Sequence, residues 1–359
     1  MPRSFSAEKT NPFSIISSPN HSPVFVHGYG SVSAAGMDAA ALYQACSNKN
    51  DITTTQLTRQ VKEETISYNV RPVDQLELRG VMPKHPRLRR ASGVTKSAIT
   101  AAAEALGEER ISSIQNGEIR LGVVVSLING CVNYSNRFYT EVVSDPSLAS
   151  PILFPETVFN APASHVAAYL GSDGPAYTLL GDSSAWFSAI DVARGWLDTD
   201  QVDGCLILCA EELDWLSCEG LSYYSRELVA TEGAAAIYLE NNPSEIELAS
   251  LLGPFDYTSH EEKRIAIQQA WEIEKDADSD LLIDGLTGIS QLDRDEQSAT
   301  DDWSGQRISP LATLGSGMGA NCGFQTIIAL EALKHNGGAS IVFASGGNQH
   351  AYSARFQKT

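Results

Sequence analysis

Short apolar runs of strand character alternate with segments of helical spacing along this chain, and this alternation limits the fold more than any other feature. The strand-like runs are rich in β-branched residues and have no polar face, which is typical of strands buried on both sides. They cover residues 24–26, 120–126, 176–180, 204–210, 234–240, 281–283 and 339–344. Helical spacing predicts helices at 38–45, 92–106, 183–197, 261–275 and 319–335, and the polar segment 294–302 is expected to be a loop. Strands alternating with helices predict a layered α/β fold.

The chain has 359 residues, 43% of them hydrophobic, enough for two ordinary domains or one large duplicated one. Each half contains a glycine turn, a buried helix of small residues and a terminal strand, which suggests duplication. Residues 1–22 mix charged residues with many serines and are expected to form a flexible arm rather than a signal peptide. No run of 18 apolar residues occurs, so we expect no membrane span and a cytoplasmic protein.

The formal charge is -19 at pH 7. Such a charge repels phosphate backbones, so no nucleic-acid partner is expected. One local cluster in this acidic chain is positively charged instead, and it consists of Lys84, Arg87, Arg89 and Arg90. This cluster either holds an anionic partner locally or belongs to a solvated loop and helix start. The six cysteines lack the paired spacing of metal ligands, which predicts free thiols in a reducing compartment and neither a metal nor a cofactor.

The turn Gly181-Asp182-Ser183-Ser184-Ala185 stands between an expected strand and an expected helix. It has the outline of a nucleophile elbow, which exposes a serine at the start of a helix. A serine acts as a nucleophile only beside a general base, and His165 and His350 are the histidines that we weigh for this role. The other interpretation is structural, because aspartate and serine are preferred helix caps. The residues alone leave both a helix cap and a Ser183-dependent acyl transfer or hydrolysis open.

Several segments together resemble the β-ketoacyl-acyl carrier protein synthase family of the thiolase superfamily. The most specific match is PILFPETVFNAPASHVAAYLGSDGP at 151–175, which resembles the lead-in to the family's nucleophile. EGAAAIYLE at 232–240 resembles the family's GEGAAALVLE strand, and GSGMGANCG at 315–323 resembles its GHTLGAAG motif. Weaker matches are the opening strand and turn at 24–36, the strand at 120–130 and the closing glycine loop Ser345-Gly346-Gly347.

The resemblance implies a thiolase fold, in which two duplicated βαβαβαββ halves form a five-layer α-β-α-β-α arrangement. We expect an N-terminal ketosynthase-like half at 23–245 and a shortened C-terminal half at 246–359, with residues 241–302 trimmed most. Members of the family dimerise through the strand before the nucleophile, here 176–180. An apolar edge strand also needs a partner on physical grounds, because an unpaired one invites aggregation.

The family's active site contains a cysteine nucleophile, two histidines and usually a lysine. Aligning Gly174-Pro175 with the family's GP dipeptide puts the nucleophile at Ser183. The first histidine aligns with Asp284, the second with Ser316 and the lysine with Leu311. All four chemical positions are changed. Neither a leucine nor a hydroxyl relays protons near pH 7 or stabilises an enolate as imidazoles do.

A family member without the catalytic thiol often acts as a chain-length factor, which pairs with an active ketosynthase and shapes the tunnel for the growing chain. The resemblance therefore predicts such a subunit of a type II polyketide, aryl polyene or fatty-acid-like system, without activity of its own. The alternative is a Ser183-dependent acyltransferase or hydrolase acting on acyl thioesters.

The expected partners are the active ketosynthase and, through the complex, an acyl carrier protein. Carrier proteins are acidic, so we expect docking on a more basic catalytic partner. Bulky side chains at the dimer-facing tunnel would set product length, although they can equally be ordinary core. The candidates for this role are Tyr134, Phe138, Phe159, Trp186 and Phe187.

Overall fold

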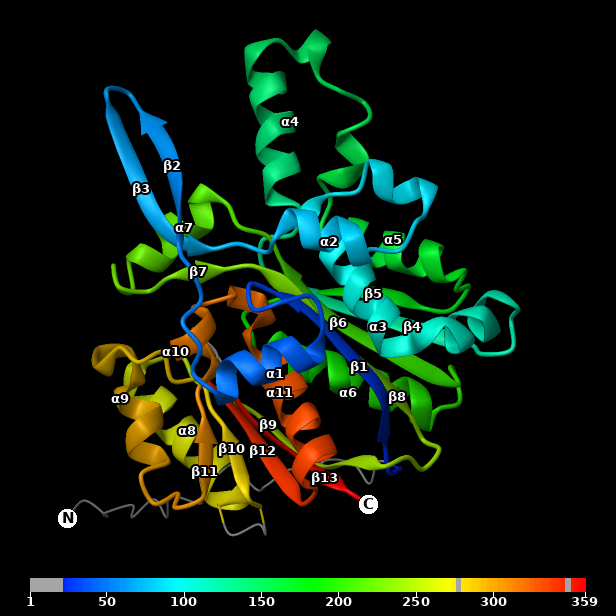
Figure 1. Ribbon diagram of the computed structural model, residues 1–359, viewed down its shortest axis with the longest axis vertical. Coiled ribbons are helices and arrows are strands. Elements are labelled where there is room, and N and C mark those ends of the chain that lie inside the picture. Colours follow the sequence, from blue (N-terminus) through cyan, green and yellow to red (C-terminus); the bar gives the residue numbers. More distant parts are fainter. Residues whose placement is uncertain (1–21, 276–278, 346–349) are drawn as a thin grey trace, which may run out of the picture.

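A computed structural model describes residues 22–275, 279–345 and 350–359 (Figure 1). The expected N-terminal arm at 1–22 lies outside the described residues except for Ser22, whose backbone N–H donates to Asp198 Oδ1 over 3.0 Å. Gly346 and Gly347 of the closing glycine loop also lie outside the described residues.

The first half of the chain builds five strands of the main sheet. They are β1 (Phe25–Ser33), β4 (Leu121–Leu127), β5 (Ala176–Leu180), β6 (Gly204–Glu211) and β8 (Gly233–Glu240), in the spatial order β1-β8-β6-β4-β5. β8 runs antiparallel to both β1 and β6, whereas β6, β4 and β5 are parallel. The last strand, β5, pairs with β4 on one side only and forms an edge.

The second half repeats this pattern strand by strand. Its strands are β9 (Ile246–Asp256), β10 (Leu281–Ile283), β11 (Gln306–Ile308), β12 (Ala339–Ser345) and β13 (His350–Lys358), in the order β9-β13-β12-β10-β11. The parallel and antiparallel pairs are the same as in the first half. The two sets join where Phe25 of β1 pairs with Glu247 of β9. The repeated order and direction confirm the expected duplication.

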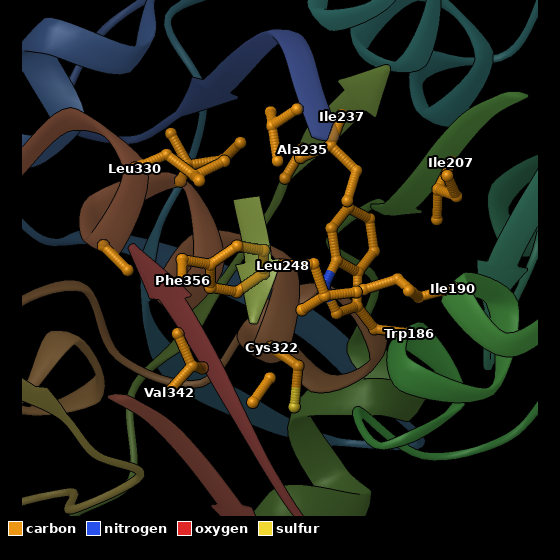
Figure 2. Close-up of a cluster of buried hydrophobic side chains, with 14 of the residues drawn as sticks. Trp186, Ile190, Ile207, Ala235, Ile237, Leu248, Cys322, Leu330, Val342 and Phe356 are labelled. Carbon is orange, nitrogen blue, oxygen red and sulfur yellow. The ribbon is translucent and has the colours of Figure 1, made fainter. Parts of the chain in front are cut away.

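Two helices lie between the two halves of the sheet, α6 (Ala185–Asp198) and α11 (Asn321–Asn336). Their side chains form the central core together with the inward-facing residues of both sets of strands, as Figure 2 shows. In β6, for example, Ile207 belongs to this central core, whereas its neighbours Leu206 and Leu208 belong to a separate outer core. The period of two follows from the pleat, because successive side chains point to opposite faces.

The outer faces are covered by two further pairs of helices. α3 (Gly93–Gln115) and α5 (Ala161–Leu170) pack on the first set of strands, and α8 (His260–Glu274) and α9 (Ser290–Ala299) lie over the second. Strands such as β4 and β6 are buried along their whole length, since a helical layer lies on each side. These helices and strands confirm the five-layer thiolase fold expected from the resemblance.

The remaining elements lie around the ends of the strands. The hairpin of β2 (Thr55–Val61) and β3 (Glu64–Arg71) forms a small second sheet with β7 (Ala230–Thr231), and Figure 1 shows this hairpin and α4 (Val132–Ser144) projecting from the body. The other α-helices are α1 (Ala39–Ser47), α2 (Gln75–Val81), α7 (Trp215–Ser222) and α10 (Pro310–Leu314). Short 3₁₀ turns cover Pro86–Arg89, Pro146–Leu148, Phe154–Glu156 and Met318–Ala320.

The prediction of a loop at 294–302 was wrong, because residues up to Ala299 belong to α9. The buried positions of α9 are Asp293, Glu296 and Ala299. Two acids therefore occupy the inward face, where a surface helix normally carries apolar residues, and the apolar periodicity that identifies such a helix is missing.

Candidate functional site

The turn before α6 is closed by Asp182 rather than by Ser183. The Asp182 carboxylate accepts hydrogen bonds from the backbone N–H of Ser184 at 2.9 Å and from the Ser184 hydroxyl at 2.5 Å. The Ala185 N–H donates to the Asp182 carbonyl at 3.0 Å, and Ser184 occupies the cap position of α6. The hydroxyl of Ser183 is thus left for a contact outside the turn.

That contact is with Cys322, in the first turn of α11. A hydrogen bond joins Ser183 to the Cys322 thiol, so the starts of the two central helices meet at this point. The thiol is buried, and burial raises its pKa well above the ordinary value. The hydrogen bond opposes this shift, whereas the nearby carboxylates of Asp182 and Glu296 add to it. Cys322 is therefore a protonated thiol, since only a lowered pKa would make it a ready nucleophile.

Asp284, aligned with the first family histidine, is completely buried and pairs with Arg307 of β11 at 3.1 Å. Its carboxylate also accepts the backbone N–H of Leu286 at 3.1 Å. Burial raises the pKa of Asp284, and a hydrogen bond from Ser309 and the charge of Arg307 oppose the shift. The position that we align with the first family histidine thus holds a carboxylate whose partners are Arg307 of β11, Leu286 and Ser309.

Two acids of α9 hold the loop that follows Asp284. Glu296 accepts the backbone N–H of Gly285 at 2.6 Å and the hydroxyl of Ser345 at 3.0 Å. Asp293 accepts the N–H of Thr287 and the N–H of Gly288, both at 2.8 Å. Burial raises the pKa of Glu296, and the charge of Asp284 raises it further. The sequence analysis did not single out either acid. The signal that could have found them is the Asp-x-x-Glu spacing of Asp293 and Glu296 shortly after the buried strand β10.

Ser316 and Leu311, which we align with the second histidine and the lysine of the family, lie in the segment before α11. The Ser316 hydroxyl accepts hydrogen bonds from the Met318 N–H at 3.3 Å and from Asn321 Nδ2 at 3.4 Å. The Ser316 backbone pairs with Val229 and Thr231. Leu311 is half-buried in α10. The Ser316 side chain is therefore part of a local turn and the Leu311 side chain part of a helix, and neither readily takes up or releases a proton near pH 7.

The two histidines weighed as bases each pair with a carboxylate. His165 Nε2 lies 2.7 Å from Glu156 Oε1, and His350 Nδ1 lies 2.7 Å from Asp256 Oδ1. Within residues 22–275, 279–345 and 350–359, no hydrogen bond joins either imidazole to Ser183. Among the described residues, neither of these two histidines is therefore placed as a base for the Ser183 hydroxyl, which nucleophilic catalysis by serine would require.

The five bulky candidates for the tunnel fall into two groups. Trp186 and Phe187 are completely buried in the central core: Trp186 Nε1 donates to Thr326 Oγ1 at 2.9 Å, and the ring of Phe187 stacks on that of Tyr352. The members of the other group lie on or beside α4. They are Tyr134, whose hydroxyl donates to the Ala91 carbonyl, Phe138, which packs on Phe154, and Phe159, which is 45% exposed.

Apolar side chains remain exposed along the β5 edge and around α4. On β5, Tyr177 is 54% and Leu180 56% exposed. α4 has no fully buried residue, and the exposed apolar residues of α4 and of the segment after it are Tyr139, Val143, Leu148, Ile152, Phe154, Val158 and Phe159. An apolar surface of this extent is typical of an interaction site.

Two cavities, of about 610 and 660 Å³, lie elsewhere on the molecule, and none of the four aligned positions lines either of them. In the part of the chain that the structure describes, no group of three or more His, Cys, Asp or Glu residues is arranged to hold a metal ion. Among the described helices, none combines the length and apolar character needed to cross a bilayer.

The fold is similar to that of known ketosynthase assemblies. It matches the ishigamide ketosynthase/chain length factor with a TM-score of 0.76 and 16% identity, over 94% of this chain and 99% of that one. It matches the ketosynthase ApeO in complex with its chain length factor ApeC from Xenorhabdus doucetiae with a TM-score of 0.76 and 14% identity, over 94% and 98%. It matches the AntDE:AntF complex, a type II polyketide synthase acyl-carrier protein with its ketosynthase, with a TM-score of 0.75 and 16% identity, over 94% and 100%.

These identities are low, and the likeness to the solved structures establishes the fold alone. No curated protein matches the sequence. The family model of the β-ketoacyl synthase N-terminal domain matches residues 22–240, which is more than half of the chain. The match includes the turn at Ser183 and every strand of the first half of the sheet. The chain therefore belongs to the β-ketoacyl synthase family.

Proposed function

We propose that this chain is a non-catalytic, chain-length-factor-like subunit that pairs with an active ketosynthase. The observation that carries the proposal is the set of residues at the four chemical positions, Ser183, Asp284, Leu311 and Ser316. Condensation needs a thiolate to accept the acyl group and imidazoles to assist decarboxylation. None of the four side chains is of these types, and the three polar ones are held by Cys322, Arg307 and Asn321.

The structural relatives support a place for this chain in type II polyketide, aryl polyene or fatty-acid-like chain elongation. Two of the three relatives described above contain a chain length factor, and the third contains an acyl-carrier protein. All six cysteines are free and buried, which supports the expected reducing, cytoplasmic compartment.

The β5 edge supports pairing with another subunit. One side of β5 has no strand partner within the described chain, and Tyr177 and Leu180 are more than half exposed. A strand from a ketosynthase would satisfy the free backbone groups and cover both side chains. A second copy of this chain would bring together two formal charges of -19, so a less acidic partner is favoured.

Product length would be set by the bulky residues around α4. Phe138 and Phe159 lie at or near the surface and become part of a buried interface only when a partner covers α4. Trp186 and Phe187 are packed inside the subunit, where a change of size would alter its stability before it altered a tunnel. We therefore give the length-setting role to the group around α4, with Tyr134 at its base.

The second candidate function is a Ser183-dependent acyltransferase or hydrolase acting on acyl thioesters. It is favoured by the position of Ser183 just before α6, where the helix dipole stabilises an oxyanion. The bond between Ser183 and a protonated thiol, together with the carboxylate partners of His165 and His350, opposes it.

Co-expression with candidate ketosynthases, followed by pull-down and intact-mass measurement of both chains after incubation with acyl thioesters, tests the two functions. The proposed function predicts a stable complex in which only the partner gains the acyl mass. Condensation of malonyl and acyl thioesters by this chain alone would overturn the proposal. An acyl mass on this chain that disappears in Ser183→Ala would establish the second candidate instead.

A further inference from the structure

The two halves of the main sheet separate next to the point where they join. β1 pairs with β8 from Phe25 to Ser33, but it pairs with β9 only where Phe25 faces Glu247. At the next position the Val26 carbonyl accepts the Ser244 hydroxyl at 2.8 Å, whereas a continued ladder would supply a backbone N–H. Val26 and Ser244 both line a cavity of about 610 Å³. We call it the junction cavity, because it lies where the two halves part.

The walls of the junction cavity come from elements far apart in sequence. β1, the start of α1 and residues 104–110 of α3 supply the side of the first half. Residues 244–246, the end of α11 and Lys358 of β13 supply the side of the second half. α3 lies close against β1 because Gly28 has no side chain, and a Cβ there would lie 1.9 Å from the Ala105 carbonyl oxygen. The cavity volume is within the range of roughly 300–1,000 Å³ that is usual for sites of small organic ligands.

Three cations from three different elements line the junction cavity. They are Arg110 of α3, Lys334 of α11 and Lys358 of β13. Lys334 pairs with Glu331 at 3.3 Å. Within residues 22–275, 279–345 and 350–359, neither Arg110 nor Lys358 lies within ion-pair distance of an acid. Two positive charges therefore face the cavity without a counter-charge from the protein, in a chain that has 44 acids and 25 lysines and arginines.

The guanidinium group of Arg110 is held in a fixed position. Its Nη1 donates to the Leu106 carbonyl at 3.2 Å, and its Cζ lies 4.6 Å from the centre of the Tyr238 ring. A guanidinium has five N–H donors in a planar fork, and this fork matches the two oxygens of a carboxylate. Because the group is already positioned, less side-chain entropy is lost when it binds an anion.

The acids of the junction cavity are engaged or solvated. The carboxylate of Glu104 accepts two backbone N–H groups, at 2.8 and 2.9 Å, and burial raises its pKa to about 7, which lowers its negative charge near neutral pH. Glu331 is buried, accepts the Tyr29 hydroxyl at 2.7 Å and pairs with Lys334. Glu245 is exposed to solvent. The groups that lack a partner in the protein are thus mainly cations, which favours an anionic ligand.

Aliphatic side chains form much of the remaining lining. They are Val26, Ala39, Ala40, Ala105, Leu106 and Ile246. A cavity that combines an apolar lining with a few charged groups suits a small molecule with an apolar body and one charged end.

We propose that the junction cavity binds a small organic carboxylate. Its carboxylate group contacts Arg110 and Lys358, and its apolar body lies against the aliphatic side chains. The site does not depend on the proposed function, since neither the four aligned positions nor β5 line the cavity. A ligand held by α3 and β13 at once would connect the two halves, so it would also stabilise the folded chain.

The test is isothermal titration calorimetry of the purified full chain near pH 7 and at low salt. Hexanoate is the main probe, hexylamine is a cation of the same length, acetate lacks most of the apolar body, and inorganic phosphate is an anion without one. We expect saturable binding of hexanoate and at least about tenfold weaker binding of acetate and of phosphate, because they bury less apolar surface. We expect no binding of hexylamine, because its ammonium group would lie beside two uncompensated cations.

Two variants place the hexanoate in the cavity. Arg110→Gln should raise the Kd of hexanoate at least about tenfold, because it removes charge-assisted hydrogen bonds to the carboxylate. Lys358→Gln should raise it at least about threefold, and this variant should fold normally because Lys358 is exposed. Arg226→Gln and Lys62→Gln remove the same charges at exposed positions that do not line the cavity, and they should change Kd by less than about twofold. Thermal unfolding without ligand checks that all four variants are folded.

Three results would overturn the inference. The first is a lack of saturable hexanoate binding to the unaltered chain. The second is a hexanoate Kd that is the same in Lys358→Gln and in folded Arg110→Gln as in the two controls, since the carboxylate would then bind elsewhere. The third is tighter binding of hexylamine or of phosphate than of hexanoate, since the cavity would then take a cation or an anion without an apolar body.

Discussion

Ser183 and Cys322 meet where the two central helices begin, one from each half of the duplicated fold. The serine that we align with the family's nucleophile is thus hydrogen-bonded to a thiol from the other half. A thiol is present near the site, but it belongs to α11 and is 1% exposed. The difference from the family's active site therefore involves more than residue 183, because the buried Cys322 side chain lies beside Ser183.

Cys322 is expected to resist alkylation in the folded protein. The reactive form of a thiol is the thiolate, and burial raises the pKa of Cys322 well above its ordinary value. Treatment with iodoacetamide near pH 8, followed by peptide mass mapping, should leave Cys322 unmodified in the folded chain and modify it in denaturant. Labelling of Cys322 in the folded chain would mean that a reactive thiol remains at the site.

Arg307→Met should destabilise the protein by about 3 kcal/mol, because it leaves the buried carboxylate of Asp284 without its cation. Adding Asp284→Asn to Arg307→Met should recover part of the loss, since the isolated charge is removed. Urea unfolding of the single and double variants measures both effects. Arg264→Met, at an exposed position of α8, is the control and should stay within about 0.5 kcal/mol. A loss no larger than that of the control would show that the pair is not structural.

Much of the fold could be predicted from the sequence because its signals are local. The run at 176–180 coincides with β5, and the capping serine of α3, Ser92, stands at the predicted start of that helix. Buried strands rich in β-branched residues can be predicted from their composition alone. The β2–β3 hairpin was not predicted, because its residues alternate between exposed and half-buried positions without a strongly apolar face.

The site was harder to predict, because its contacts join residues far apart in sequence. Nothing near Ser183 in the chain indicates that Cys322 bonds to it, and nothing near Asp284 indicates Arg307 as its partner. Part of α9 was predicted to be a loop because its sequence is polar. The buried positions of this helix hold carboxylates that bind backbone N–H groups, so no apolar face marks it as a helix. Motif resemblance gave the positions, while the partners depended on the tertiary structure.

Stability should fall as the pH rises from about 5 to about 8. Burial raises the pKa of Glu211 from 4.5 to about 8, although hydrogen bonds from the N–H groups of Ile128 and Asn129 oppose the shift. Between these two pKa values the folded state holds a proton on Glu211 that the unfolded state has released. The contribution of Glu211 to the free energy of unfolding is therefore complete below pH 4.5 and is lost as the pH rises to about 8. Burial likewise raises the pKa of Glu104, to about 7, which has the same sign.

Urea unfolding at several pH values in this range should show a smaller pH dependence for Glu211→Gln than for the unaltered chain. Glu118→Gln, at an exposed position, is the matched control and should leave the dependence unchanged. An equal dependence in all three proteins would remove Glu211 as its source.

Phe138→Ala and Phe159→Ala should lengthen the product made by the complex with an active ketosynthase, since smaller side chains around α4 leave room for further extension. Both variants should fold, because neither residue is fully buried. Trp186→Ala should instead lower the free energy of unfolding by about 3–5 kcal/mol, because it removes a completely buried indole. Product masses and thermal unfolding distinguish the two outcomes. Unchanged product length in both phenylalanine variants would exclude α4 from the length-setting role.

Tyr177→Asp and Leu180→Asp should each prevent assembly with the ketosynthase. Both side chains lie on the β5 edge, and a carboxylate there would be desolvated in the interface without a partner. Ile273→Asp is the matched control, because Ile273 is an exposed apolar residue on α8, over the second set of strands. Size-exclusion chromatography of the co-expressed subunits should give the complex for the control and separate chains for the two β5 variants. If the β5 variants eluted as the complex, the partner would have to bind elsewhere, and the exposed apolar residues around α4 would be the next surface to alter.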